Sequence, residues 1–227
     1  MKKIISLLIF AICAFSLFAC EKAPAEIPDE PVDTPAQETE KIERPDAVTA
    51  DEAFSDVDFS DYAHLKLFDS SGVTFENFEG VDSYGNKVTQ DIFGDYDVTA
   101  VNLWTTWCPY CLIEMPHLNE LYKQLPENMN LVGYCADAEE MPDDFSYIME
   151  NLPHDYTVIA ADRGLNSATE VTGNITGYPT TLFVDKNGAV IGQIAGLPLG
   201  MSAKEIDDSV IDGYKKLFKE ALKKIEE

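Results

Sequence analysis

The sequence has 227 residues, of which 45% are hydrophobic and 25% are charged, so it can bury one ordinary globular core and has little room for a second. Its 41 acidic residues against 16 lysines and arginines give a formal net charge of −25. A charge of this sign repels phosphate backbones, which argues against nucleic acid as a partner. The acidic surface is expected to keep the protein soluble, with attraction of a basic partner as the alternative.

The N-terminus carries the pattern of a secretory signal peptide. Two lysines precede an apolar run from Ile4 to Ala19, which is shorter than the roughly 20 residues that a membrane span needs. The run ends in Leu-Phe-Ala-Cys at residues 17–20, which resembles the bacterial lipobox. This resemblance implies that residues 1–19 are removed and that Cys20 is acylated, which would hold the protein on a membrane. An ordinary cleavage, with Cys20 incidental, is the alternative.

The segment that follows is rich in proline and acidic residues and has almost no apolar periodicity. Such a segment cannot bury enough surface to offset the entropy that is lost on ordering. We therefore expect residues 20–57 to be a lipidated N-terminus and a disordered linker, kept extended by its prolines and like charges. Residues 58–227 are expected to form one globular domain.

The expected domain shows short apolar segments separated by turn residues. Val98–Trp104 is almost continuously apolar, which predicts a strand that is covered on both faces and lies at the centre of a sheet. After Cys108, apolar residues at spacings of three and four predict a helix, with Pro109 in its first turn and Pro116 as a kink. The other expected elements are short strands at Phe75–Val81, Leu131–Tyr134, Thr180–Val184 and Val190–Ala195, a short element of unspecified type at Val88–Ile92, and helices near Phe145–Met149, Ser167–Val171 and Ser202–Ile225. This order predicts an α/β fold with a mixed central sheet flanked by helices.

Cys108 and Cys111 form a CxxC pair where the expected central strand passes into the helix. Their spacing brings both sulfurs to the same side of the first helical turn, close enough to close a small disulfide ring. The N-terminus of a helix has partial positive charge and free N–H groups, which favour the thiolate of the first cysteine. Cys108 is therefore the expected nucleophile, and Cys111 is the expected resolving thiol.

Two other interpretations of this pair are weaker. Half of a zinc site would need a second cysteine or histidine pair at ligand spacing, and His117 and His154 do not provide one. A purely structural disulfide would close a ring too small to constrain much of the chain. We therefore expect redox chemistry at this pair, with no metal and no other cofactor.

Three segments together resemble the TlpA/ResA branch of the thioredoxin-fold proteins. They are Val101–Cys111, Glu114-Met115-Pro116 and Gly177–Asp185, and the resemblance covers roughly residues 75–196. It implies a thioredoxin-like fold in which Pro179 is the family's cis-proline, packed beside the CxxC pair. A plain trans turn at Pro179 is the alternative.

Glu114 lies three residues after Cys111, so the two fall on one side of the expected helix. The resemblance implies that a glutamate at this position tunes thiol ionisation. If it is partly buried, its raised pKa would let it accept or return the proton of Cys111. A solvated helical glutamate is the alternative. Asn102 stands where cytoplasmic thioredoxins have a buried acid, which makes Glu114 the better candidate.

Aromatic residues surround the expected site. The residues expected to contact a substrate are Trp107, Pro109, Tyr110 and Tyr178. Trp104 fits a core position and a docking position equally well. Cys135 follows a strand that should neighbour the central one, and we expect it to be a small buried residue, with an alternative disulfide near the site as the other interpretation.

The resemblance implies a thiol–disulfide reductase, lipid-anchored on the extracytoplasmic face of a bacterial cell membrane. Its electrons would come from a membrane thiol donor of the CcdA type, and its candidate substrates are apocytochrome c, methionine sulfoxide reductase and other exported proteins with disulfides. An oxidase that introduces disulfides is the alternative within the same chemistry, although the pair lacks the basic residue that would favour the most oxidising extreme. A binding module whose CxxC pair is incidental is the alternative of a different class.

Overall fold

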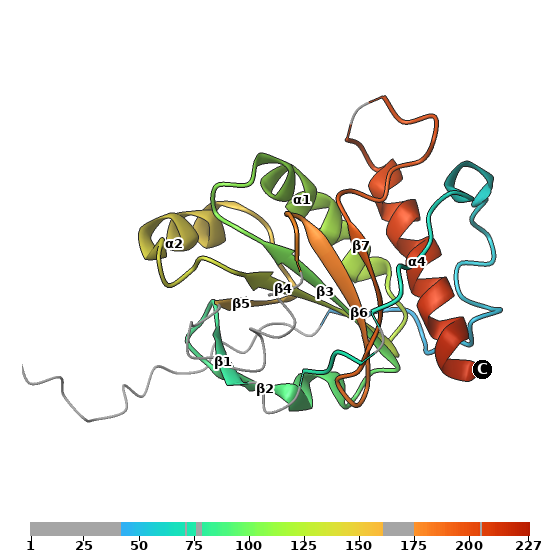
Figure 1. The fold of residues 1–227 in the computed structure, drawn as a ribbon, viewed down its shortest axis with the longest axis horizontal. Helices are drawn as coiled ribbons and strands as arrows, with labels where there is room; N and C mark the ends of the chain where they lie inside the picture. Colours follow the sequence, from blue (N-terminus) through green and yellow to red (C-terminus); the bar gives the residue numbers. More distant parts are fainter. Residues whose placement is uncertain (1–41, 71, 76–78, 161–174, 205) are drawn as a thin grey trace, which may run out of the picture. The chain divides into compact units, whose positions relative to one another are not determined.

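The computed structural model describes residues 42–227 apart from 71, 76–78, 161–174 and 205, and within these residues it contains one mixed sheet. The strands are β1 (Glu79–Asp82), β2 (Lys87–Thr89), β3 (Val98–Trp104), β4 (Met129–Cys135), β5 (Thr157–Ala160), β6 (Thr180–Asp185) and β7 (Val190–Ala195). Their order across the sheet is β2-β1-β5-β4-β3-β6-β7 (Figure 1). β4 pairs in parallel with both β3 and β5, and the other pairings are antiparallel.

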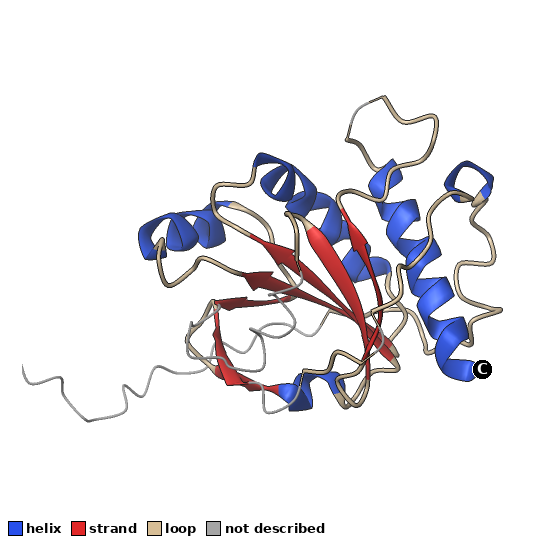
Figure 2. Cartoon of the chain, viewed as in Figure 1, coloured by secondary structure: helices blue, strands red, loops and turns tan. Residues whose placement is uncertain are grey.

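Helices of the described residues pack on this sheet (Figure 2). The helices are α1 (Pro109–Gln124), α2 (Pro142–Asn151) and α4 (Ser209–Glu226), with short 3-10 turns η1 (Ser60–Tyr62) and η2 (Gln90–Phe93). In the described part of the chain, α1, α2 and α4 all contribute to one core cluster, together with Ala100 and Trp104 of β3. Val101 and Leu103 of the same strand belong to a second cluster, which Phe93 of η2 helps to close. Alternate residues of β3 therefore enter opposite cores, and the expected α/β architecture with a mixed, helix-flanked sheet is confirmed.

The expected elements agree best where the local pattern is strongest. β3 has the expected bounds, all seven of its residues are buried, and α1 begins at Pro109 as expected. The last helix begins at Ser209 rather than Ser202, and the described strand β1 spans Glu79–Asp82, while residues 76–78 of the first expected strand lie outside the described residues. The expected helix at residues 167–171 lies outside the described residues. Strand β5 was not expected at all.

The domain begins earlier than the expected boundary at residue 58. Residues 42–57, here called the N-terminal strap, pack against the folded domain, with Ala50 3% and Ala53 1% exposed. Arg44 Nη1 donates a hydrogen bond of 2.8 Å to the carbonyl of Met129, and its guanidinium lies 4.8 Å from the ring centre of Tyr122. The prediction of disorder through residue 57 is therefore wrong for the strap, because a few well-placed contacts with an existing surface hold it. Residues 1–41, including Cys20, lie outside the described part.

The position of the strap relative to the sheet is well defined. Met129, which accepts the bond from Arg44, is paired with Val98 at the start of the two central parallel strands. The opposite ends of these strands are Trp104 and Cys135. Seven residues of strand extend over about 20 Å, so the strap lies at one edge of the sheet and the CxxC pair follows the other edge. None of the helices in the described residues is long and apolar enough to cross a membrane.

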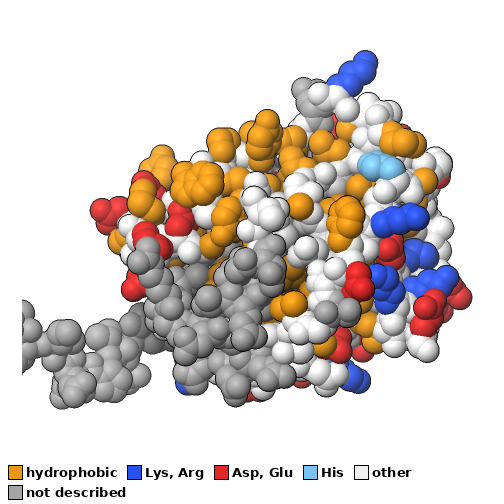
Figure 3. Space-filling view, viewed as in Figure 1, with side chains coloured by type: hydrophobic (Ala, Val, Ile, Leu, Met, Phe, Trp, Pro, Cys, Tyr) orange, Lys and Arg blue, Asp and Glu red, His pale blue; other side chains and the backbone are white. Residues whose placement is uncertain are grey.

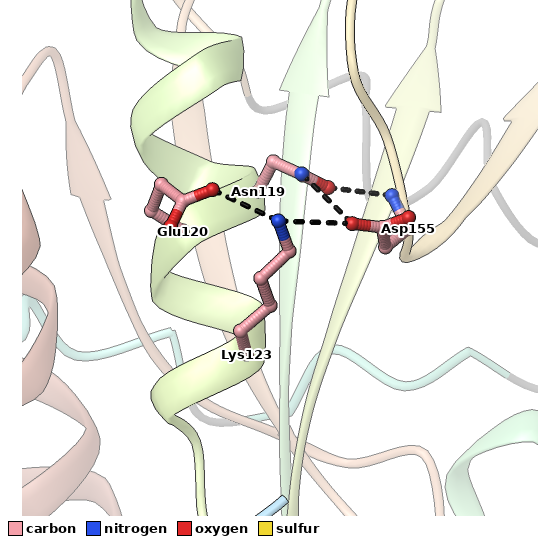
Figure 4. Close-up of polar contacts among 4 residues, drawn as sticks. All are labelled: Asn119, Glu120, Lys123 and Asp155. Atoms are coloured by element: carbon pink, nitrogen blue, oxygen red, sulfur yellow. Dashed lines mark hydrogen bonds and ion pairs between the residues drawn. The ribbon is translucent and has the colours of Figure 1, made fainter. Parts of the chain in front are cut away.

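Polar contacts fix the middle of α1 against the loop that precedes β5 (Figure 4). The Asn119 side chain, 2% exposed, donates to the Asp155 carboxylate at 2.9 Å and accepts the Asp155 backbone N–H. Lys123 bridges the carboxylates of Glu120 and Asp155, at 2.9 and 3.3 Å. Asn119 thus bonds both the carboxylate and the backbone N–H of Asp155. These two bonds hold the helix that carries the CxxC pair at a defined distance from β5.

Candidate active site

The sulfurs of Cys108 and Cys111 are joined in a disulfide at the start of α1. Cys108 is the N-cap residue with an extended backbone, and its sulfur accepts the backbone N–H of Cys111 at 3.2 Å. Pro109 occupies the first helical position, where its missing N–H costs no helical hydrogen bond. The helix N-terminus therefore directs a donor at the Cys108 sulfur, as the sequence predicts, and this donor would also stabilise a thiolate.

The loop between β3 and Cys108 is anchored to the end of the neighbouring strand. The Asp137 carboxylate accepts the backbone N–H of Thr106 at 2.9 Å and the Thr106 hydroxyl at 2.8 Å. Asp137 comes two residues after β4 ends at Cys135. This contact was not expected from the sequence, although buried strands were expected at the positions of both β3 and β4. A carboxylate just beyond the end of β4 is the signal that could have revealed it, because parallel neighbours end at the same sheet edge.

The cis bond between Tyr178 and Pro179 lies at the same edge of the sheet. Thr180, which follows directly, is the first residue of β6 and pairs with Leu103 of β3. Pro179 is buried, and its carbonyl accepts the N–H of Gly196. The alternative of a trans bond is therefore wrong. Because Thr180 pairs with Leu103 near the end of β3, Pro179 lies close to the end of the strand that leads to Cys108.

Exposed aromatic side chains surround the disulfide. Trp107 is 67% exposed and Tyr110 is 61% exposed, while the half-buried Tyr178 ring meets Trp107 edge to face at 6.2 Å between centroids. Pro109 is exposed beside them. Figure 3 shows apolar side chains gathered over α1 and α2 on this face of the molecule. The four residues expected to contact a substrate are therefore accessible around an almost completely buried disulfide.

Glu114 is fully buried behind the disulfide, one helical turn after Cys111. The Tyr214 hydroxyl donates to its Oε1 at 2.6 Å, and Asn102 Nδ2 donates to its Oε2 at 3.3 Å. Burial raises the pKa of Glu114 from its ordinary 4.5 to about 7, and these two hydrogen bonds oppose that rise. The interpretation of Glu114 as a solvated helical glutamate is therefore wrong. Its pKa suits proton exchange near neutral pH.

Trp104 and Cys135 are core residues. Trp104 is 1% exposed and its ring stacks on Phe145 at 6.1 Å. Cys135 is fully buried, and its thiol donates to the Asp137 carboxylate at 3.2 Å. Burial, followed by the nearby Asp137 charge, raises the pKa of Cys135, so this thiol stays protonated and unreactive in the folded protein. In the part of the chain that the structure describes, no group of three or more potential ligands could hold a metal ion.

The sheet, the disulfide at the N-terminus of a helix and the neighbouring cis-proline define a protein of the thioredoxin-like fold. The fold agrees with a crystal structure of a putative thiol:disulfide interchange protein DsbE from Chlorobium tepidum, with a TM-score of 0.52 and 22% identity over 68% of this chain and 99% of that one. The chain belongs to the Redoxin family, whose model matches residues 70–206.

Curated relatives carry related names. Thiol-disulfide oxidoreductase ResA of Bacillus cereus is 31% identical over 127 residues, which cover 53% of this chain and 66% of that protein. Thiol:disulfide interchange protein DsbE of Haemophilus influenzae is 28% identical over 114 residues, covering 50% and 59%. The chain thus spans less than two thirds of the length of these relatives.

Proposed function

We propose that this protein is a lipid-anchored thiol–disulfide oxidoreductase that reduces disulfides of exported proteins. The observation that carries the proposal is the Cys108–Cys111 disulfide at the start of α1, with Pro179 near it and Glu114 buried behind it. The names of the ResA and DsbE relatives support the same chemistry.

The reducing cycle begins with the dithiol form of the pair. The Cys108 thiolate attacks one sulfur of a substrate disulfide, forming a mixed disulfide and releasing the other substrate sulfur as a thiolate. Glu114, as a carboxylate, takes the proton of the Cys111 thiol. The Cys111 sulfur then attacks Cys108, which forms the Cys108–Cys111 bond and breaks the mixed disulfide. The second substrate sulfur leaves as a thiolate and is protonated by solvent, so the substrate gains the two electrons that the pair loses.

The exposed aromatic side chains supply a docking surface for this cycle. Trp107 and Tyr110 are accessible beside the disulfide, and Tyr178 precedes the cis-proline. These side chains are large and mostly apolar, and each carries one polar group. They are therefore suited to contact an extended polypeptide segment around a substrate cysteine. The substrate class that we propose is therefore a polypeptide disulfide, with apocytochrome c and methionine sulfoxide reductase as candidates.

The anchor places this cycle outside the cytoplasm. Residues 1–19 read as a signal peptide and Cys20 as the acylated residue. The strap enters the domain beside Met129, at the sheet edge opposite the CxxC pair. A membrane thiol donor of the CcdA type would return the pair to the dithiol, and exported proteins would be the substrates of the pair. Substitution C20A should abolish incorporation of labelled fatty acid, and unchanged incorporation would remove the anchor from the proposal.

Trapping of mixed disulfides tests the redox function directly. In the full anchored chain, C111A should leave Cys108 bound to its substrates, because the resolving thiol is missing. Non-reducing gels should show bands of higher molecular mass that contain exported proteins and disappear on reduction. The double variant C108A/C111A is the matched control. If C111A traps no more protein than the double variant while both are folded, the proposed redox function is wrong, and a binding module would remain.

A further inference from the structure

A closed cluster of four buried polar side chains links the catalytic helix to the C-terminal helix. Glu114 of α1, Tyr214 of α4, Asn102 of β3 and Thr181 of β6 are each 2% exposed or less. Tyr214 and Glu114 are 100 residues apart in the sequence, yet their 2.6 Å hydrogen bond is the shortest in the cluster. Nothing in the CxxC chemistry by itself requires a contact with α4.

We propose that Tyr214 is a positioning residue for the resolving step, whose hydroxyl holds the Glu114 carboxylate and sets the pH range in which Glu114 takes the proton of Cys111. The inference rests on the proposed function, in which Glu114 is the proton acceptor. It adds a residue on a different helix, which governs when that acceptor is available.

The direction of each hydrogen bond in the cluster follows from which side chains carry a proton to donate. Asn102 Nδ2 donates to Glu114 and, at 3.1 Å, to the Thr181 hydroxyl. The single Tyr214 proton goes to Glu114, so the 2.9 Å contact between Thr181 and Tyr214 requires Thr181 as the donor. Each carboxylate oxygen therefore accepts a hydrogen bond, and each hydroxyl both donates and accepts. Such a chain of donors strengthens the final bond to the carboxylate.

The same hydroxyl can serve Glu114 in both protonation states. When Glu114 is charged, Tyr214 donates to it. When Glu114 is neutral, its own proton can be donated to the Tyr214 oxygen, which is also an acceptor. A hydrogen bond to a charged group is the stronger of the two, so Tyr214 favours the carboxylate on balance. Burial alone would keep Glu114 protonated at neutral pH, and a protonated carboxyl cannot accept the proton of Cys111.

Among the described residues, the other titratable groups near Glu114 do not donate a hydrogen bond to its carboxylate. Tyr156 directly precedes β5, and burial and the Glu114 charge both raise the pKa of Tyr156, so it stays neutral. On α1 itself, Cys111 lies one turn before Glu114 and His117 one turn after it. His117 is directed to Asp208 by a 3.1 Å contact. Tyr214 is thus the titratable side chain that donates a hydrogen bond to the carboxylate.

The experiment uses single-turnover kinetics of the full chain in detergent, with the reduced protein and a chromogenic aryl disulfide. The first aryl thiol is released when Cys108 attacks, and the second is released when Cys111 resolves the mixed disulfide. We expect Y214F to shift the pH midpoint of the second step by about one unit to higher pH, because one hydrogen bond to the charged form is lost. The matched control is Y62F, which removes a buried tyrosine hydrogen bond to Ser209 at the start of the same helix without touching Glu114.

Comparison with E114Q separates this inference from the function on which it rests. E114Q should remove the ionisation from the second step, and adding Y214F to E114Q should cause no further shift. If E114Q removes the ionisation but Y214F leaves the wild-type midpoint, the role of Tyr214 is wrong and that of Glu114 stands. If E114Q retains the wild-type profile, both roles are wrong. Should circular dichroism show Y214F to be unfolded, T181V takes its place, with a smaller shift in the same direction expected and an unchanged midpoint overturning the inference.

Discussion

Replacement of Glu114 with glutamine should change the pH dependence of folding in a defined direction. The side chain is neutral in both the folded and unfolded states below pH 4.5, and charged in both above the folded-state pKa of about 7. Between these values the unfolded chain has released a proton that the folded protein retains, so stability falls as pH rises. A shift from 4.5 to about 7, at about 1.4 kcal/mol per unit, corresponds to a loss of roughly 3 kcal/mol above pH 7.

Glutamine lacks this loss because it does not titrate. In E114Q the side-chain oxygen can still accept from Tyr214, but its NH2 group meets the amide of Asn102, where two donors oppose each other. That mismatch should cost about 1–2 kcal/mol at every pH. The quantity predicted is therefore the change with pH: relative to wild type, E114Q should gain roughly 2–3 kcal/mol of stability between pH 5 and pH 8.

Urea unfolding of the oxidised protein at pH 5, 6, 7 and 8, followed by tryptophan fluorescence, measures this difference. The matched control is E120Q on the exposed side of the same helix, where only a surface ion pair with Lys123 is lost. That loss should change stability by less than about 0.5 kcal/mol. Parallel pH curves for E114Q and wild type would refute the reasoning, since they would mean that the buried carboxyl has the same pKa in the folded and unfolded states.

Three further predictions follow from contacts outside the buried cluster. R44A should lower the free energy of unfolding by about 1–3 kcal/mol, because the strap loses its bond to the Met129 carbonyl, and urea unfolding checks this; an unchanged midpoint would show that the strap adds no stability. D137A should destabilise the loop before the disulfide by about 1–2 kcal/mol, with partial recovery in D137N, which keeps an acceptor for Thr106; equal thermal midpoints for D137A and wild type would contradict the anchoring role. In the reduced native protein, iodoacetamide should modify Cys108, whose thiolate is stabilised at the helix N-terminus, and leave Cys135 unmodified until unfolding; early labelling of Cys135, detected by mass spectrometry, would contradict its burial.

The parts of the fold that sequence predicts well are those specified by local patterns. The apolar run of β3 and the proline at the first position of α1 occur within twelve residues of each other, so the junction that carries the CxxC pair is recognisable without tertiary information. The bounds of β3 and the start of α1 were accordingly as expected. The cis bond before Pro179 was expected from the family resemblance, because the residues alone allow either isomer.

The strap and β5 were missed because their order depends on the surface they meet. The strap has an acidic, proline-containing composition, yet Ala50 and Ala53 are buried against the rest of the domain. β5 has only four residues and gains its hydrogen bonds from pairing with β4 and β1. Neither segment has enough periodicity of its own to predict its state.

The site residues that are close together in the sequence could be predicted, whereas contacts between distant segments could not. Glu114 was located by its distance in the sequence from Cys111, whereas its buried hydrogen bond comes from Tyr214 on a different helix, 100 residues away. The Asp137 contact to Thr106 has the same character, since it joins residues at the ends of two different strands. Side-chain contacts between distant segments are what the structure adds to the sequence.

The reduction potential of the Cys108–Cys111 pair tests the central claim most directly. The full chain in detergent is equilibrated in a series of thiol–disulfide buffers, and its free thiols are trapped and counted by mass, with Cys135 as an internal thiol that does not change. A reductase of exported proteins should have a potential near that of thioredoxin, about −270 mV. A value near that of DsbA, about −120 mV, would contradict the claim and identify the protein as a disulfide-forming oxidase.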